Sequence, residues 1–526
     1  MVLSSDFLWP WCAALLGLVL SILLEQCMQP RPPLRRPVAA WAVHAGIWLV
    51  VHGMLTILLG RPWFAMAAGL AALLTVVLVN NAKFKALHEP FVFQDYEYFT
   101  DAIRYPRLYI PFFGWWKFLL ATAGFVTAVG IGWWWEEVST ARWSVTGQVG
   151  ALAWQCLLGS VLLVLGSRQR LNLGLDAQRD VLALGLLAAL WRYALMGRRL
   201  PRAQGVFAAD AQKKGRGQGV GGLSLKPLRL PDLVAVQSES FFDARTLFAG
   251  IHPHVLEHLD ALQAEAFVHG SMQVPAWGAN TVRTEFAFLT GIEGADLGVH
   301  QFNPYRAVAA GWQVASLAQY LQRLGYRTVC VHPYPAGFYL RHKVYPLLGF
   351  DTFIDIQDFV DAERYGPYVS DMAVTEKIMQ LLHERADGDK PLFVFAITME
   401  NHGPLHLERV APEDMQQLYG TAPPAGCEDL TIYLRHLRNA NRMIGSLHMQ
   451  LDALKRPVSL CWYGDHVPIM PTVYATFGQP SGLVPYACWR NSAARSNAAE
   501  NGLPPQLLTA DMLSCQWLAG LGLWRD

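Results

Sequence analysis

The chain has 526 residues, of which 53% are hydrophobic and only 16% are charged, and its mean hydropathy is +0.21. About a quarter of the residues of an ordinary soluble protein are charged, so part of this chain is expected to lie in a membrane. Its 42 basic and 41 acidic residues give a net charge of +1, which excludes the strongly basic surface typical of a nucleic-acid partner. An aromatic content of 12% excludes a disordered chain.

The apolar excess lies in the first two hundred residues. A helix needs about 20 mostly apolar residues to cross the hydrocarbon core of a bilayer, and five stretches qualify: 7–24, 38–59, 63–78, 116–135 and 149–166. Residues 1–200 are therefore predicted to form a polytopic α-helical membrane domain. A sixth apolar stretch, 181–196, contains Arg192. We expect it to form an interfacial helix, and a sixth span is the alternative.

The basic residues leave the orientation of this domain open. They follow the first span (Arg31, Arg35, Arg36) and the third (Lys83, Lys85, Arg104, Arg107, Lys117). The positive-inside rule places both of these loops in the cytoplasm. With five spans the rest of the chain would then be cytoplasmic as well, whereas with six spans it would be outside.

The pattern changes after the membrane domain. Residues 201–231 lose periodicity and gain Gly, Lys and Arg, which is typical of a flexible linker. Beyond them, short continuous apolar runs at 233–236, 328–331, 392–397 and 458–462 indicate strands buried on both faces, and helical patterns at 314–324 and 370–383 lie between them. This alternation predicts that residues 232–526 form an α/β domain with a largely parallel central sheet.

Carboxylates and imidazoles follow each of the four predicted strands. Glu239 comes after the first, His332 after the second, His402 after the third, and Asp465 with His466 after the fourth. In an open α/β sheet, ligands bind outside the carboxyl ends of the strands. These side chains are therefore expected to meet at one edge of the sheet and to form a metal or catalytic site.

Glu239, Asp465 and His466 offer two oxygen ligands and one nitrogen ligand. This set suits one divalent ion such as Mn²⁺, Zn²⁺ or Mg²⁺, and the imidazole weighs against Mg²⁺. Three protein ligands leave a position open, as catalysis requires. Thr281 precedes an apolar helix and is the candidate nucleophile, because coordination to a metal lowers the pKa of a hydroxyl. As alternatives, Thr281 could be only a helix N-cap, and Thr284 is the rival hydroxyl.

The order of these motifs resembles a known family. A glutamate after the first strand is followed by Gly278-x-x-Thr281-x-x-x-Glu285-Phe286, His332-x8-Arg341 before Gly349-Phe-Asp351, Asn401-His402 and Asp465-His466. This order resembles the lipoteichoic acid synthase and phosphoglycerol transferase branch of the alkaline phosphatase/sulfatase superfamily, over about residues 233–469. The resemblance implies a five-span anchor in a bacterial-type cytoplasmic membrane and an α/β alkaline phosphatase/sulfatase-like domain outside it.

The resemblance also implies residue roles. Glu239, Thr281, Asp465 and His466 would hold the metal, with Mn²⁺ expected; Thr281 would be the nucleophile and His402 a proton donor or acceptor; His332, Arg341 and Tyr339 would bind the phosphate and headgroup. Arg341 would grip two phosphate oxygens at once. Tyr339 stands where the family often has tryptophan, so packing of the headgroup can differ there.

The implied activity is transfer of phosphoglycerol from a membrane phospholipid, phosphatidylglycerol, through a phosphothreonine to a cell-envelope glycan. Alternatives are a phosphoethanolamine transferase, a phosphodiester hydrolase, or a scaffold for envelope assembly without activity. Sulfatases carry a Cys/Ser-x-Pro-x-Arg motif where this chain has Thr281-Val-Arg283, so formylglycine-dependent sulfate hydrolysis is disfavoured. The eight cysteines indicate no disulfide framework.

Overall fold

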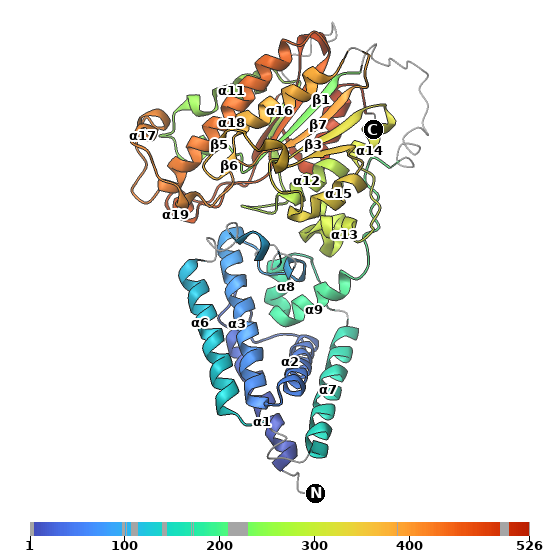
Figure 1. The fold of residues 1–526 in the computed structure, drawn as a ribbon, viewed down its shortest axis with the longest axis vertical. Coiled ribbons are helices and arrows are strands. Elements are labelled where there is room, and N and C mark those ends of the chain that lie inside the picture. Colours follow the sequence, from blue (N-terminus) through green and yellow to red (C-terminus); the bar gives the residue numbers. More distant parts are fainter. Residues whose placement is uncertain are drawn as a thin grey trace. The chain divides into compact units, whose positions relative to one another are not determined.

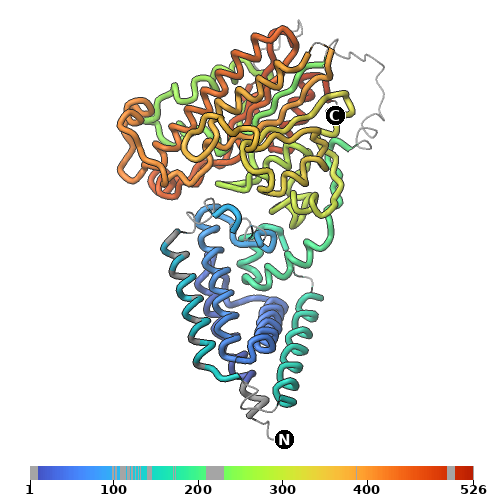
Figure 2. Tube along the Cα trace, viewed as in Figure 1, coloured from blue at the N-terminus to red at the C-terminus, as the bar shows by residue number. Residues whose placement is uncertain are grey.

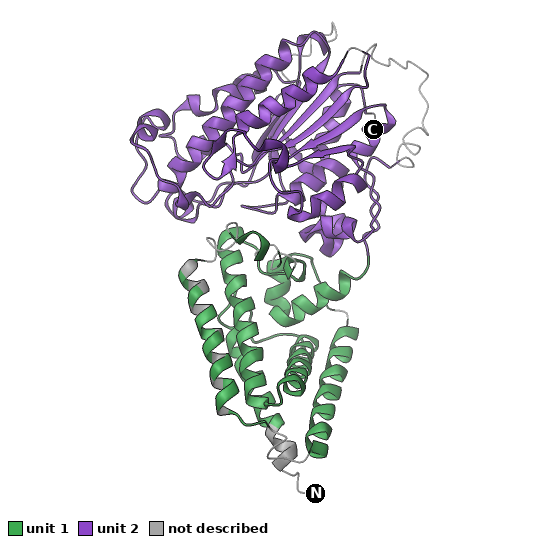
Figure 3. Ribbon diagram, viewed as in Figure 1, with its two compact units in different colours: residues 1–199 green, residues 200–526 purple. Residues whose placement is uncertain are grey.

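The computed structural model divides the chain into two compact units, Met1–Arg199 and Leu200–Asp526, which we call the helical unit and the α/β unit (Figure 3). It describes residues 5–96, 100, 103–106, 114–138, 145–169, 171, 173–208, 230–386, 388–494 and 504–524. Most of the predicted linker, residues 209–229, lies outside the described residues. The described part before it contains Phe207, which is buried against Tyr320 and Trp524 of the α/β unit.

Five long helices form most of the helical unit (Figure 1). They are α1 (Ser5–Glu25), α2 (Val38–Leu59), α3 (Pro62–Leu87), α6 (Trp115–Trp135) and α7 (Val145–Arg168), and each contains one of the predicted apolar stretches. Among the described residues, α2, α3 and α7 are long and apolar enough to cross a membrane. An apolar, helical N-terminal region is therefore confirmed.

The sixth apolar stretch is divided by Gly185 into two short helices, α8 (Ala177–Leu184) and α9 (Leu186–Met196). Gly185 has a φ of +79°, and a Cβ atom there would lie 1.8 Å from Nη1 of Arg36, so only glycine fits. The 11 residues of α9 rise only about 16 Å, which is too short to cross a bilayer. Neither helix is long enough for a sixth span, and the interfacial position stays a prediction.

Glycines allow α2 and α7 to pack closely. A Cβ atom on Gly46 would lie 2.7 Å from the carbonyl oxygen of Gly159, and one on Gly166 would lie 2.8 Å from that of Ala39. Small residues of this kind let two helices approach where no hydrophobic effect drives them together, as in lipid. Gln155 adds a polar contact, since its side-chain amide donates to the carbonyl oxygen of Leu49 over 2.9 Å.

The α/β unit is built on an eight-stranded sheet with the order β10-β2-β9-β8-β1-β7-β3-β4. Figure 1 labels its neighbouring strands β1, β7 and β3, and Figure 2 traces the backbone through the same unit. The strands are β1 (Asp232–Ser238), β2 (Val268–Gln273), β3 (Arg327–Val331), β4 (Thr352–Ile354), β7 (Leu392–Ile397), β8 (Val458–Gly464), β9 (Val484–Arg490) and β10 (Gln506–Thr509). Two further strands, β5 (Arg364–Tyr365) and β6 (Tyr368–Val369), pair separately.

The four predicted strands are the adjacent central strands β8, β1, β7 and β3, and all run parallel. Every residue of β1, β7 and β8 is buried, which explains why their sequences are continuous apolar runs. The largely parallel sheet is thus confirmed. The exception is β9, which the sequence did not predict and which runs antiparallel to both β2 and β8.

Helices cover both faces of the sheet (Figure 1). On one face α18 (Glu428–Asp452) packs against α11 (Glu257–Glu265) and α16 (Asp371–Glu384); on the other, α12 (Thr281–Thr290) packs against α14 (Leu317–Arg323) and α20 (Ala510–Gly520). The shorter helices α13 (Pro304–Ala309), α15 (Arg341–Leu347), α17 (Pro412–Leu418) and α19 (Pro471–Phe477) join these layers. The predicted helices at 314–324 and 370–383 correspond to α14 and α16.

Candidate metal centre and active site

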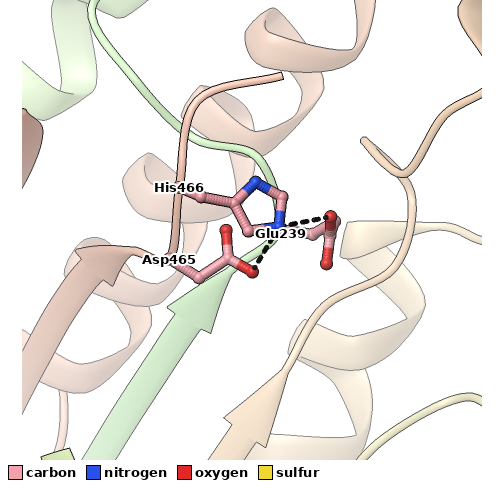
Figure 4. A group of neighbouring side chains, drawn as sticks. All are labelled: Glu239, Asp465 and His466. Carbon is pink, nitrogen blue, oxygen red and sulfur yellow. Dashed lines mark ion pairs between the residues drawn. The ribbon is translucent and has the colours of Figure 1, made fainter. Parts of the chain in front are cut away.

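The carboxyl ends of β1 and β8 bring three metal-ligating side chains together (Figure 4). Glu239 follows β1, and Asp465 and His466 follow β8, its parallel neighbour. One ligand atom from each of them lies within 4.8 Å of the other two. Gly464 makes this approach feasible, because a Cβ atom there would lie 2.0 Å from the carbonyl oxygen of Phe241.

The three side chains are buried and incompletely satisfied. Asp465 accepts a hydrogen bond from the backbone N–H of Ser240 with Oδ1 (2.7 Å), but its Oδ2 has no hydrogen-bond partner among the described residues. His466 directs Nδ1 to the carbonyl oxygen of Val467 (3.1 Å), which leaves the lone pair on Nε2 without a partner there. Nε2 lies 3.4 Å from Asp465 Oδ2 and 3.6 Å from Glu239 Oε1. Two orphaned atoms thus converge with a carboxylate oxygen on one point, which is the arrangement that a divalent cation requires.

Electrostatics support the same interpretation. Burial, and then the charge of Asp465, raises the pKa of Glu239, and burial raises the pKa of Asp465 to about 7. Burial also lowers the pKa of His466, which favours the neutral imidazole that binds metals. Two buried carboxylates beside a neutral histidine are unfavourable without a positive charge. The residues therefore fit a divalent ion.

Thr281 lies beside this group. It is the first residue of α12, and its hydroxyl is 3.5 Å from Oε2 of Glu239. The interpretation of Thr281 as an N-cap is wrong, because Asn280 occupies that position with a φ of +66°, a backbone conformation that asparagine tolerates. The rival hydroxyl, Thr284, donates to the carbonyl oxygen of Asp465 (2.8 Å) and is fully buried, so it is structural.

A pocket opens beside Thr281. Its lining includes all the predicted residues except Asp465 and His466: Glu239, Ala279, Asn280, Thr281, His332, Phe338, Tyr339, Arg341, Met399 and His402. The structure thus brings the predicted nucleophile and the predicted phosphate-binding residues to one cavity next to the metal ligands.

Arg341 is held by a second buried cluster, which we call the Glu285 node: Glu285, Arg341, Tyr305 and Tyr345. Nε and Nη2 of Arg341 donate to the two carboxylate oxygens of Glu285 over 3.2 and 2.8 Å. The hydroxyls of Tyr305 and Tyr345 also donate to Glu285. Because two nitrogens of Arg341 are engaged, a grip by Nε and Nη2 on two phosphate oxygens, the usual bidentate geometry, is not open to it. Nη1 donates one hydrogen to His332, and its second hydrogen remains for the phosphate.

His332 adjoins the Glu285 node and is held as a neutral ring. Its Nδ1 lies 3.3 Å from the carbonyl oxygen of Ile397, and its Nε2 lies 3.1 Å from Nη1 of Arg341. A carbonyl only accepts and a guanidinium only donates, so Nδ1 carries the proton and Nε2 is the acceptor. Burial, and then the positive charge of Arg341, lowers the pKa of His332 well below 6.5. His332 therefore orients Arg341 and is unsuited to donate a proton.

His402 is the proton-transferring candidate that the structure leaves available. Its Nδ1 lies 2.7 Å from the carbonyl oxygen of Gly403, which fixes the proton on that nitrogen in the neutral ring. The hydroxyl of Tyr368, on β6, lies 3.3 Å from the same Nδ1 and donates to Gly403. No motif in the sequence indicated Tyr368.

Tyr339 lies on a turn with unusual backbone geometry. Tyr339 and Leu340 have φ angles of +54° and +57°, and such positions occur where the surrounding structure holds them. The ring of Tyr339 packs against Phe338 (centroids 4.2 Å apart) and lies 5.3 Å from the guanidinium carbon of Arg341. An aromatic ring is therefore fixed at the pocket wall, beside the arginine.

Comparisons with known proteins agree with this fold. The model of the family described as Sulfatase matches residues 231–510. The chain is 28% identical over 463 residues to the capsular polysaccharide biosynthesis protein RkpI of Rhizobium meliloti, covering 85% of this chain and 82% of that protein. It is 30% identical over 257 residues to a putative cyclic beta-1,2-glucan modification protein of the same organism, which covers 48% of this chain and 38% of that protein.

A solved structure shares the architecture of both units. The lipooligosaccharide phosphoethanolamine transferase A of Neisseria meningitidis, an integral membrane protein, aligns with a TM-score of 0.56 and 14% identity over 99% of this chain and 97% of that one. At this identity the similarity establishes the fold alone. It joins an apolar helical region to the same kind of α/β domain.

Proposed function

The chain belongs to the sulfatase family, and from that premise we propose that it is a membrane-bound, metal-dependent transferase. It moves phosphoglycerol from a phospholipid, phosphatidylglycerol, to a cell-envelope glycan through a covalent intermediate on Thr281. The observation that carries this proposal is the position of the Thr281 hydroxyl, 3.5 Å from Glu239, in a pocket that also contains Arg341 and His402.

The reaction is proposed to have two displacements at the same phosphorus. In the first, the bond from Thr281 Oγ1 to phosphorus forms as the bond to the diacylglycerol oxygen breaks; the hydroxyl proton of Thr281 passes to solvent, and His402, protonated on both ring nitrogens, supplies a proton to the departing oxygen. In the second, the bond from a glycan oxygen to phosphorus forms as the bond to Thr281 Oγ1 breaks; the glycan hydroxyl gives its proton to His402, and Thr281 regains a proton from solvent. A divalent ion held by Glu239, Thr281, Asp465 and His466, Mn²⁺ or Zn²⁺, would stabilise the threonine alkoxide and the charge on the phosphoryl oxygens.

The pocket supports phosphoglycerol as the headgroup. Ethanolamine carries an ammonium group, which is expected to need a carboxylate partner in a buried site. Among the described residues that line the pocket, Glu239 is the one carboxylate, and it belongs to the metal-ligand group. A glycerol headgroup brings neutral hydroxyls, which the side chains of Asn280, Tyr339 and His402 can bind.

The apolar helices support attachment to a membrane, and the relatives support a glycan acceptor. A lipid donor accounts for the attachment of an α/β enzyme to apolar helices, because the substrate then need not cross water. The names of the two Rhizobium relatives refer to a capsular polysaccharide and a glucan, which supports a glycan acceptor. Glycans of this kind lie outside the cytoplasmic membrane, so we place the catalytic unit there, with the helices as a multi-pass anchor.

The test is mass spectrometry of the full chain after incubation with labelled phospholipids and Mn²⁺. We expect phosphatidylglycerol to add a phosphoglycerol group to the peptide that contains Thr281. Phosphatidylethanolamine should add no group to it. The variant Thr281→Ala should form no adduct, whereas Thr284→Ala should still form one. An adduct from phosphatidylethanolamine would replace the proposed headgroup. An active Thr281→Ala variant would refute the proposed mechanism.

A further inference from the structure

The Glu285 node cancels a charge that faces the substrate. Arg341 is 1% exposed and Glu285 is fully buried, and they are joined by two hydrogen bonds. Burial alone would lower the pKa of Arg341, but the Glu285 carboxylate more than offsets this, and the pKa stays well above its ordinary value. Burial raises the pKa of Tyr305 and of Tyr345 well above 10, so their hydroxyls remain donors. The node is thus a cation and an anion whose charges sum to zero.

The other groups at the pocket add little net charge, apart from the proton that His402 exchanges during the reaction. His332 is neutral, because its two ring nitrogens face a carbonyl and a guanidinium. The charges of Glu239 and Asp465 would balance a divalent ion. A phosphodiester carries one negative charge, whereas a phosphomonoester near pH 8 carries two. A site without surplus positive charge therefore binds a phosphomonoester, with its second negative charge, less well than a phosphodiester.

We propose that Glu285 is a specificity-determining residue, which restricts this site to singly charged phosphodiesters by neutralising the arginine that faces the phosphate. The inference deepens the proposed function, since phosphatidylglycerol and the threonine-bound phosphoglycerol are both phosphodiesters with one negative charge. It also explains why the Glu285 carboxylate is buried against Arg341, the one arginine among the described residues that line the pocket. An arginine without this partner would attract doubly charged phosphate more strongly.

The test compares two chromogenic substrates that differ in charge. The full chain, loaded with Mn²⁺, is assayed with p-nitrophenyl phosphate and with bis-p-nitrophenyl phosphate, and kcat/KM for the monoester is divided by that for the diester. Glu285→Gln keeps the size of the side chain and removes its charge, so we expect this ratio to rise about tenfold. Binding of inorganic phosphate at pH 8, measured by calorimetry, should strengthen relative to that of dimethyl phosphate.

Two matched variants separate charge from disturbance of the fold. Tyr345→Phe removes one hydrogen bond to Glu285 and no charge, so it should lower both activities alike and leave the ratio unchanged. Asp232→Asn removes a buried carboxylate at the start of β1 that pairs with two other arginines: its Oδ2 lies 2.6 Å from Nε of Arg456 and 3.2 Å from Nη1 of Arg385. That variant should also leave the ratio unchanged.

A double variant keeps the inference testable if Glu285→Gln does not fold. Arg341→Gln with Glu285→Gln lacks both charges and leaves no unpaired ion in the core. Relative to Arg341→Gln alone, it should again raise the ratio of monoester to diester activity and tighten phosphate binding. If neither Glu285 substitution moves the ratio in a protein that still binds Mn²⁺, or if Asp232→Asn moves it equally, the inference is wrong. Neither outcome depends on which lipid headgroup is transferred.

Discussion

Two clusters of buried charge lie at the same edge of the sheet and differ in how they are satisfied. In the metal-ligand group of Glu239, Asp465 and His466, the ligand atoms converge and two of them have no hydrogen-bond partner among the described residues. In the Glu285 node, both carboxylate oxygens receive donors and the charge is matched by Arg341. Burial is nearly complete in both. The first cluster is therefore complete only with a cation, whereas the second is complete as it stands.

The largest expected effect comes from removing a charge from the metal-ligand group. Asp465→Asn replaces an anionic ligand with a neutral amide, so we expect affinity for Mn²⁺ or Zn²⁺ and formation of the Thr281 adduct to fall by more than about a hundredfold. Calorimetry and mass spectrometry measure the two effects. An Asp465→Asn variant that bound metal normally would show that the three side chains are not the ligands.

The same kind of change in the Glu285 node should damage stability instead. Glu285→Gln leaves the buried Arg341 without its counter-charge, and breaking a buried pair in this way costs about 3–5 kcal/mol. We expect the free energy of unfolding in urea to fall by this amount while Mn²⁺ affinity is retained. A variant as stable as the wild type would mean that the guanidinium finds another partner, and a loss of metal affinity would mean that the two clusters are coupled.

Added metal should stabilise the folded protein only when the metal-ligand group is intact, whether or not the Glu285 node is intact. At a hundred to a thousand times its dissociation constant, a ligand that binds only the folded state adds about 3–4 kcal/mol to the free energy of unfolding. We expect Mn²⁺ or Zn²⁺ to raise the melting temperature of the wild type and of Glu285→Gln, and a chelator to reverse the effect. Asp465→Asn should show no such rise.

Without metal, the same substitution, Asp465→Asn, should have the opposite effect on stability. Asp465 has a folded pKa of about 7, above its unfolded value of 3.8, because burial disfavours its charge. Its contribution to stability is therefore present below about pH 4 and is lost as the pH rises through 7. In the presence of chelator at pH 8, Asp465→Asn should be at least as stable as the wild type. A less stable variant would mean that a protein group already neutralises Asp465.

The sequence predicted the first cluster and not the second, for a physical reason. Glu239, Asp465 and His466 directly follow continuous apolar strands, and parallel strands bring their carboxyl ends to one edge. Glu285 lies inside α12 and follows no strand, so the pattern of strand ends did not indicate it. Its partners Tyr305 and Tyr345 come from α13 and α15, two short helices with no periodic pattern, so their convergence depends on tertiary packing.

The elements of the fold also divide into those that the sequence predicted and those that it did not. The central strands were predicted because both of their faces are buried, which produces continuous apolar sequences. The strand β2 was missed because its burial alternates, with polar residues such as His269 and Ser271. A short strand with alternating burial carries too weak a pattern to be separated from a loop. Apolar helices are predictable from composition alone, whereas the break at Gly185 depends on its positive φ, which the apolar pattern does not reveal.

The smallest expected effect comes from a third buried cluster. Its carboxylates have a cationic partner, His436, but this cation can lose its proton. His436 lies between two carboxylates, with Nε2 2.8 Å from Glu408 and Nδ1 3.4 Å from Glu400. Burial alone would lower the pKa of His436, but hydrogen bonds to Glu400 and Glu408 raise it to about 9. Two more groups face the ring region: Arg435, which pairs with Glu408, and the ring of Tyr365.

Because the folded pKa of His436 exceeds its unfolded value of 6.5, its stabilisation is fully present below pH 6.5 and is lost as the pH rises through 9. We expect the free energy of unfolding to fall by about 1–3 kcal/mol between pH 6.5 and 9.5. His436→Gln should remove this part of the pH dependence, and urea titrations of the two proteins across this range measure it. An equal slope in both proteins would show that His436 is already neutral. The cluster would then contain unbalanced carboxylates, like the metal-ligand group.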